Sequence, residues 1–187
     1  MAHSNVFEHI VKSYLQRLPS TMGVFKLMGD RLLAEFGNEV ALSGLMPAGV
    51  TLLRGAEGDY AQWSKAHGSA YDGFLLSSAN AFPAQLATVL EHLRHGRAAQ
   101  AERCSAAISA AVADAFAAVV EVRQGNAFTN ANKALAHIMA YGRDALEAPP
   151  PRLYGGSYLP HSILKVVMES LTHHGLLPER GYLESRR

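Results

Sequence analysis

The chain has 187 residues, of which 49% are hydrophobic and 18% charged, and its formal net charge is +1 with neutral histidines. This composition supports one domain with a buried core and excludes a predominantly disordered chain. Basic residues form no stripe interleaved with aromatic residues and no apolar run reaches about 20 residues, so we predict no nucleic-acid partner and no membrane span. A single cysteine, Cys104, and a charged segment without an apolar signal core at residues 1–18 favour a cytoplasmic protein.

The first half of the chain has the pattern of short strands that alternate with helices. The spacing of its apolar residues and its Pro and Gly stops predict, in order, a helix at 5–18, a strand at 22–28, a helix at 30–36, strands at 40–42 and 50–54, a helix at 60–67 and a strand at 73–77. This alternation is typical of parallel βα units.

The second half has only helical periodicity. We predict helices at 83–94, 97–122, 130–141 and 161–174, the first of them opened by Pro83 and the last separated from the others by a proline-rich stop after Glu147. The fold class is therefore α/β. Residues 1–124 form βα units, and residues 125–187 form a helical extension of the same domain.

Several short motifs, taken in order, resemble those of one known family. They are LPSTMGVFKLMGD at 18–30, VTLLRGAE at 50–57, DGFLLSSAN at 72–80, LRHG at 93–96, NKAL at 132–135 and LTHHGLLP at 171–178. In this order they are similar to the dihydrodipicolinate synthase / N-acetylneuraminate lyase family, whose members are (β/α)8-barrel Schiff-base lyases. A complete barrel of this kind needs about 250 residues. The resemblance therefore implies a partial TIM barrel, similar to strands six to eight with their helices, plus a C-terminal helical cluster.

The resemblance also implies an activity and a site. It implies a lyase or aldolase in which Lys26 forms a Schiff base with pyruvate or another 2-oxo acid, without a metal or other cofactor. Gly55 would let a substrate carboxylate approach the backbone, and Leu75 would cover the imine. Lys26 lies among apolar neighbours, which disfavour an ammonium and so suit an amine nucleophile. The alternative is that Lys26 ends a strand and reaches water.

Two departures from the family pattern leave other interpretations open. Aligned without gaps, the Schiff-base position falls on Phe25, and a shift of one residue turns a side chain to the other face of a strand. A β-bulge between Gly23 and Lys26 would restore the lysine. The tyrosine relay and the threonine-rich loop of the family belong to strands that precede this match.

Because half a barrel exposes strand edges and an apolar interior, we expect a homo-oligomer or a complementing chain. One alternative is a catalytically inactive, truncated relative that acts as a binding or assembly module or is an incomplete gene product. Another is an unrelated α/β domain that oligomerises through its Ala-rich helix at 105–122.

Other polar residues allow less specific interpretations. Ser77, Ser78 and Asn80 follow the strand at 73–77, where they would either bind a substrate hydroxyl or cap the next helix. Two histidine pairs, at 92 and 95 and at 173 and 174, lack a Glu or Cys that would complete a zinc set. We interpret them as surface histidines at helix ends and predict no metal.

Overall fold

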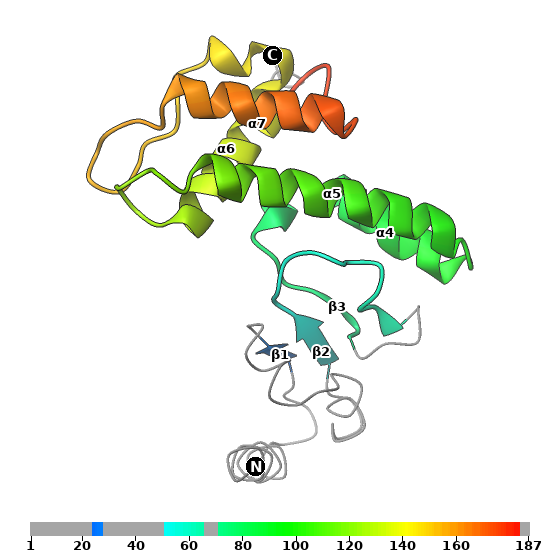
Figure 1. Cartoon of the computed structure of the whole chain (residues 1–187). Coiled ribbons are helices and arrows are strands. Elements are labelled where there is room, and N and C mark those ends of the chain that lie inside the picture. The colour runs from blue at the N-terminus through cyan, green and yellow to red at the C-terminus, as the bar shows by residue number, and fades with distance from the viewer. Residues whose placement is uncertain (1–23, 28–50, 66–70, 184–187) are drawn as a thin grey trace, which may run out of the picture.

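Four α-helices and a small parallel sheet make up the part of the chain that the computed structural model describes, which is residues 24–27, 51–65 and 71–183. In Figure 1 the helices form a block at one end and the strands lie below it. The mixed α/β class is therefore confirmed. The elements predicted at 5–18, 30–36 and 40–42 lie outside the described residues.

The sheet consists of three short parallel strands. β1 (Val24–Leu27), β2 (Thr51–Arg54) and β3 (Gly73–Phe74) lie side by side in the order β1-β2-β3. Within the described ranges each strand pairs with the strand that follows it in the sequence, as in sheets built from successive βα units. The strands predicted in these three places are confirmed, although β3 stops before the predicted end at Ser77.

The four helices are α4 (Pro83–Arg94), α5 (Ala98–Ala118), α6 (Ala127–Tyr141) and α7 (His161–His173). α4 and α7 agree with the prediction to within one residue, whereas α5 ends four residues before the predicted end at 122. α4 begins at its proline, whose fixed φ angle suits the first turn of a helix. α6 begins at Ala127 rather than at the predicted residue 130. The reason is that the Asn126 side chain accepts a 2.8 Å hydrogen bond from the Thr129 amide and so caps the helix earlier.

α5 lies at the centre of these four helices, which we call the helical block, and packs against α4, α6 and α7 (Figure 1). Small side chains predominate on its buried face, which consists of Ala101, Ser105, Ile108, Ala111, Val112 and Ala115. Small residues let the neighbouring helices approach closely. The core of the chain covers this face, while oligomerisation through the Ala-rich helix at 105–122 stays a prediction.

The last described residues pack closely against the end of α6. The amide of Leu183 donates to the carbonyl of Ala140 at 3.0 Å. Gly142, which follows α6, has a φ of +59°, and a Cβ there would lie 2.7 Å from the backbone nitrogen of Gly181. A glycine is therefore required at this position by both the backbone conformation and the close approach of the chain.

The α-helix predicted at 60–67 is wrong for residues 60–64, which form a turn and an isolated parallel bridge between Ser64 and Tyr71, and residue 65 has a 3-10 conformation. The backbone amides of this segment find other partners. That of Ala61 donates to Ser105 Oγ on α5 at 3.2 Å, and that of Lys65 donates to the Tyr71 carbonyl at 2.8 Å. Since these amides are satisfied outside the segment, a helical hydrogen-bond ladder does not form.

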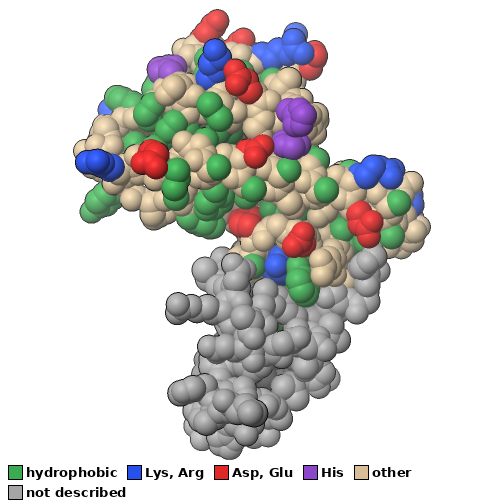
Figure 2. Space-filling view, in the orientation of Figure 1, with side chains coloured by type: hydrophobic (Ala, Val, Ile, Leu, Met, Phe, Trp, Pro, Cys, Tyr) green, Lys and Arg blue, Asp and Glu red, His purple; other side chains and the backbone are tan. Residues whose placement is uncertain are grey.

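Acidic and basic side chains are interspersed over the helical block on the face shown in Figure 2. No single-sign field covers that face, while the absence of a nucleic-acid partner stays a prediction. None of the helices in the described ranges is both long enough and apolar enough to cross a bilayer.

Candidate functional site

The ends of β2 and β3 bring together two of the three residues predicted to form the site. Gly55 directly follows β2, and Leu75 directly follows β3. Arg54 pairs with Phe74, and the Leu75 amide donates to the Arg54 carbonyl at 2.9 Å. Gly55 and Leu75 therefore occupy corresponding positions at two neighbouring strand ends.

The third predicted residue, Lys26, lies in β1. The backbone register pairs residue 26 with Leu53, which in turn pairs with Gly73. Residue 25 pairs instead with Leu52. Pairing is one-to-one from residue 24 to residue 27, so the bulge proposed before Lys26 does not interrupt the described strand.

The two faces of the strands differ in burial. Leu52 and Arg54 alternate with Leu53 along β2 and are 1% and 4% exposed, whereas Leu53 is half-buried. A Cβ on Gly73 would lie 3.3 Å from Leu53 Cδ2, so the Leu53 side chain covers Gly73. Leu75 is 47% exposed. The face of Leu53 and Leu75 is therefore apolar and partly open.

Arg54, on the other face, organises the loop after β2. Its Nη1 donates to the carbonyls of Ala56 at 2.8 Å and Gly58 at 2.7 Å, and its guanidinium lies 4.9 Å from the centre of the Trp63 ring. A buried guanidinium needs such acceptors, because an uncompensated charge in the interior is costly. The loop is therefore wrapped around this side chain.

Glu57 joins this loop to the turn after β3. Its Oε2 accepts from Ser78 Oγ at 2.5 Å and from the Tyr60 hydroxyl at 3.0 Å, and its Oε1 accepts from the Ser78 amide at 3.1 Å. Ser78 is fully buried and begins a short 3-10 turn, Ser78–Asn80. Both carboxylate oxygens therefore bind groups of the chain itself.

Tyr60 is fully buried beside this carboxylate, with its ring edge against Phe74 at 6.0 Å between centroids. Burial raises the pKa of Tyr60 to about 12, the hydrogen bond to Ser78 opposes the rise, and the charge of Glu57 adds to it. Tyr60 is therefore a protonated hydrogen-bond donor at neutral pH rather than a base.

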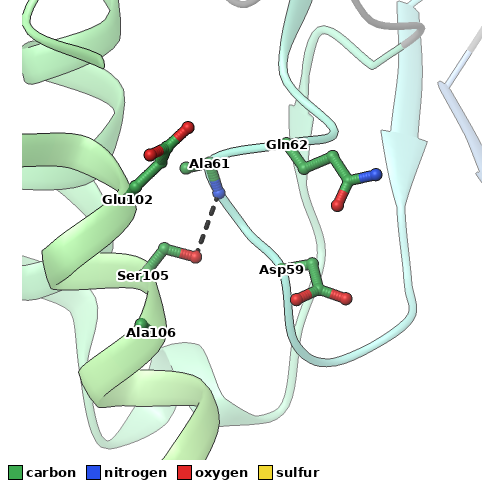
Figure 3. A pocket seen from close by; sticks show the side chains of 6 residues that line it. All are labelled: Asp59, Ala61, Gln62, Glu102, Ser105 and Ala106. Carbon is green, nitrogen blue, oxygen red and sulfur yellow. Dashed lines mark hydrogen bonds between the residues drawn. The ribbon is translucent and has the colours of Figure 1, made fainter. Parts of the chain in front are cut away.

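Helix α5 also forms hydrogen bonds to this loop, one of which is drawn in Figure 3. Ser105 Oγ accepts from the Ala61 amide, and Ser109 Oγ accepts from the Asp59 amide at 3.1 Å. Between the loop and the helix lies a hollow of about 320 Å³, lined by Asp59, Ala61, Gln62, Glu102, Ser105 and Ala106. Its rim carries two carboxylates. We call the loop and strand ends together, residues 54–65 and 73–82, the strand-end region.

The three polar residues that follow β3 differ in their contacts and exposure. Ser78 binds Glu57, Ser77 makes no capping hydrogen bond through its side chain, and Asn80 is exposed. The residue that caps α4 is Phe82, so the prediction that one of the three polar residues caps this helix is wrong. Whether Ser77 or Asn80 binds a substrate hydroxyl stays a prediction.

A second hollow, of about 590 Å³, lies between the start of α6 and residues 152–154. Lys133, part of the NKAL motif, donates there to the carbonyl of Arg152 and so ties α6 to this loop.

Two of the histidines considered as metal ligands contact other side chains. His92 accepts a hydrogen bond from Arg97 at 2.9 Å, and His174 lies 3.2 Å from Asp114. Within the described ranges, no three His, Cys, Asp or Glu side chains gather closely enough to hold a metal.

Arg54 and Tyr60, which hold the loops at the strand ends in place, were not predicted from the sequence. A signal for Arg54 was present, since an arginine that directly follows two leucines in a predicted strand must find partners in the interior. No comparable signal marks Tyr60, whose partner Ser78 is 18 residues away. The contacts of both residues depend on how the two loops meet.

Comparisons of the chain with models of protein families, with characterised proteins and with solved structures find no match. The resemblance to the lyase family therefore rests on the short motifs quoted above. The arrangement of the strand ends is a separate, structural observation, and the function must be argued from both together.

Proposed function

We propose that the chain is a lyase- or aldolase-type protein of the dihydrodipicolinate synthase family, with Lys26 forming a Schiff base with pyruvate or another 2-oxo acid. One observation carries the proposal. The register assigns residue 26 to the row of Leu53 and Gly73, two positions before Gly55 and Leu75 on the neighbouring strands. Positions two residues apart on a strand share a face. This backbone register supports position 26, rather than position 25, as the Schiff-base position of the proposal.

The proposed chemistry is the formation of an imine. The neutral amine of Lys26 attacks the ketone carbon of the 2-oxo acid, and the carbonyl oxygen leaves as water after proton transfer, giving a protonated imine. Gly55 admits the substrate carboxylate close to the backbone, and Leu75 covers the imine from the neighbouring strand. Neither the formation of the imine nor the binding of the substrate carboxylate requires a metal or a dissociable cofactor.

The arrangement of the strands also supports a partial (β/α) barrel. Among the described residues, three parallel strands are neighbours in the order in which they occur in the chain, as successive barrel strands are, and the proposed site would lie at their carboxyl ends. A barrel of eight strands needs about 250 residues, more than the 187 of this chain. We therefore propose that the chain acts as a homo-oligomer or with a complementing chain, in the cytoplasm, where its one cysteine, Cys104, stays reduced.

The test is to trap the imine. The purified protein is incubated with pyruvate and borohydride, and the intact mass and a peptide map are recorded. We expect one reduced pyruvate adduct, located on Lys26. Lys26→Arg should abolish it, because a guanidinium does not form the imine, whereas Lys165→Arg, an exposed lysine on α7, should leave it unchanged.

A second variant tests the register itself. Exchanging the two residues, Phe25→Lys with Lys26→Phe, should abolish the adduct if position 26 faces the site. An adduct on the relocated lysine would instead assign the site to position 25. If folded wild-type protein forms no adduct, the proposal fails, and a catalytically inactive binding or assembly module becomes the better interpretation.

A further inference from the structure

The Glu57 carboxylate is occupied almost completely by the chain. An ionised carboxylate offers about four acceptor positions, and three are filled by the Ser78 amide, the Ser78 hydroxyl and the Tyr60 hydroxyl. Ser78 and Tyr60 are both fully buried. The carboxylate therefore points into the junction between two loops and holds them together.

These two loops are the continuations of the strands that carry Gly55 and Leu75. Glu57 lies two residues after Gly55, and Ser78 lies three residues after Leu75, while the two bonded residues are 21 positions apart in the chain. The hydrogen bonds of Glu57 thus set the separation and orientation of the two strand ends. An apolar contact would constrain them less, because it has no preferred direction.

We infer that Glu57 is a positioning residue for the proposed imine site, which fixes Gly55 and Leu75 relative to each other without touching the substrate. This inference rests on the proposed function. It gives Glu57 a role that depends on its hydrogen bonds rather than on its charge. A carboxylate that bound substrate or transferred protons would depend on its charge instead.

Two substitutions at the same position separate these roles. Glu57→Gln keeps the shape, and its amide can accept from the Ser78 amide and donate to the two hydroxyls. Glu57→Met keeps the length and removes every hydrogen bond. We expect Glu57→Met to raise the pyruvate concentration that gives half-maximal trapping by on the order of tenfold, since small misplacements at a reacting centre have effects of this size. We expect Glu57→Gln to stay within about twofold of wild type.

Glu102→Met is the matched control, because Glu102 is an exposed carboxylate on α5 at the rim of the hollow in Figure 3 and should not alter trapping. Ser78→Ala removes one of the three hydrogen bonds and should give an intermediate effect if Glu57→Met fails to fold. Equal impairment by Glu57→Gln and Glu57→Met would overturn the inference, since charge would then be the property that matters. An unchanged Glu57→Met would overturn it as well.

Hydrogen exchange at the Ser78 amide keeps this test separate from that of the proposed function. We expect exchange at this amide to accelerate by at least tenfold in Glu57→Met and little in Glu57→Gln. If wild-type protein forms no adduct but exchange responds in this way, the imine proposal fails and the link between the loops stands. If exchange is unchanged in Glu57→Met, the positioning role is excluded whatever the trapping result.

Discussion

In the helical block most buried side chains are apolar, and the largest of those without solvent contact include Ile108 and Leu135. In the strand-end region, buried positions include the charged Arg54 and the hydroxyl of Ser78. The helices are held by contacts that depend on volume and area. The loops share this apolar core through Tyr60, Leu76 and Phe82, and are held in addition by hydrogen bonds that depend on the identity and direction of each group.

This difference between the two regions predicts which kinds of substitution each of them tolerates. Apolar packing accepts one hydrophobic residue in place of another of similar volume at modest cost. A hydrogen-bond network such as that of Glu57, Ser78 and Tyr60 tolerates substitution less well. A buried donor that loses its acceptor has given up its hydrogen bonds to water without a replacement, which destabilises the fold. We therefore expect volume changes to act throughout the shared apolar core, which includes Leu76 and Phe82, and changes of hydrogen-bonding groups to act mainly on the strand-end region.

The largest effect is expected from a cavity in the helical block. Leu135→Ala on α6 removes a side chain with no solvent exposure and should lower the free energy of unfolding by about 2–5 kcal/mol. Urea unfolding measures this, with Val166→Ala, 49% exposed on α7, as the control. A loss at Leu135 no larger than that of the control would contradict the assignment of Leu135 to the apolar core.

A smaller effect is expected when the guanidinium of Arg54 is replaced by an ammonium group, which keeps the positive charge. Arg54→Lys loses the paired hydrogen bonds to the Ala56 and Gly58 carbonyls and the contact with Trp63. We expect unfolding to become easier by about 1–3 kcal/mol, because an ammonium does not reproduce the planar guanidinium. Arg94→Lys on α4 is the exposed control. If both variants unfold at the same urea concentration, Arg54 does not organise the loop.

The smallest effect concerns an exposed polar link within the helical block. Hydrogen bonds from Ser170 and then His174 hold the pKa of Asp114 below its ordinary value of 3.8. A lowered folded-state pKa means that the stabilisation is fully present above pH 3.8 and is lost as the pH falls through the folded value. Asp114→Asn should therefore be slightly less stable than wild type at neutral pH.

Thermal unfolding across the acid range checks this prediction. The difference in Tm between wild type and Asp114→Asn should shrink as the pH falls below 3.8. Glu169→Gln, an exposed carboxyl on α7, is the control and should show no such convergence. A constant difference across this range would show that the ionised carboxylate of Asp114 contributes nothing.

Much of the helical block could be predicted from the sequence. The helical spacing of apolar residues and the position of Pro83 gave the bounds of α4 within the chain, and α5 and α7 followed from the same periodicity. The same reasoning failed at residues 60–65. Tyr60, Ala61 and Ser64 are buried at a spacing that also fits a helix, but amides of this segment bond to α5 and to Tyr71 instead.

The site could be predicted only in part. Gly55 and Leu75 were identified from their motifs, and the structure brings them to neighbouring strand ends. The sequence alone left Phe25 and Lys26 as alternatives, because the face of a strand position depends on how the strand pairs with its neighbour. The one-to-one backbone pairing of residues 24–27 bears on this choice, and the assignment of Lys26 stays a proposal.

What the sequence by itself determined is the pattern of burial along each helix and the order of strands and helices, since periodicity is a local property of neighbouring residues. Only the tertiary structure decided how the strand ends are joined. The bonds from Glu57 to Ser78 and from Ala61 to Ser105 span 21 and 44 positions. Their donors and acceptors are common polar groups, and each selects its partner by proximity and direction after the chain has folded.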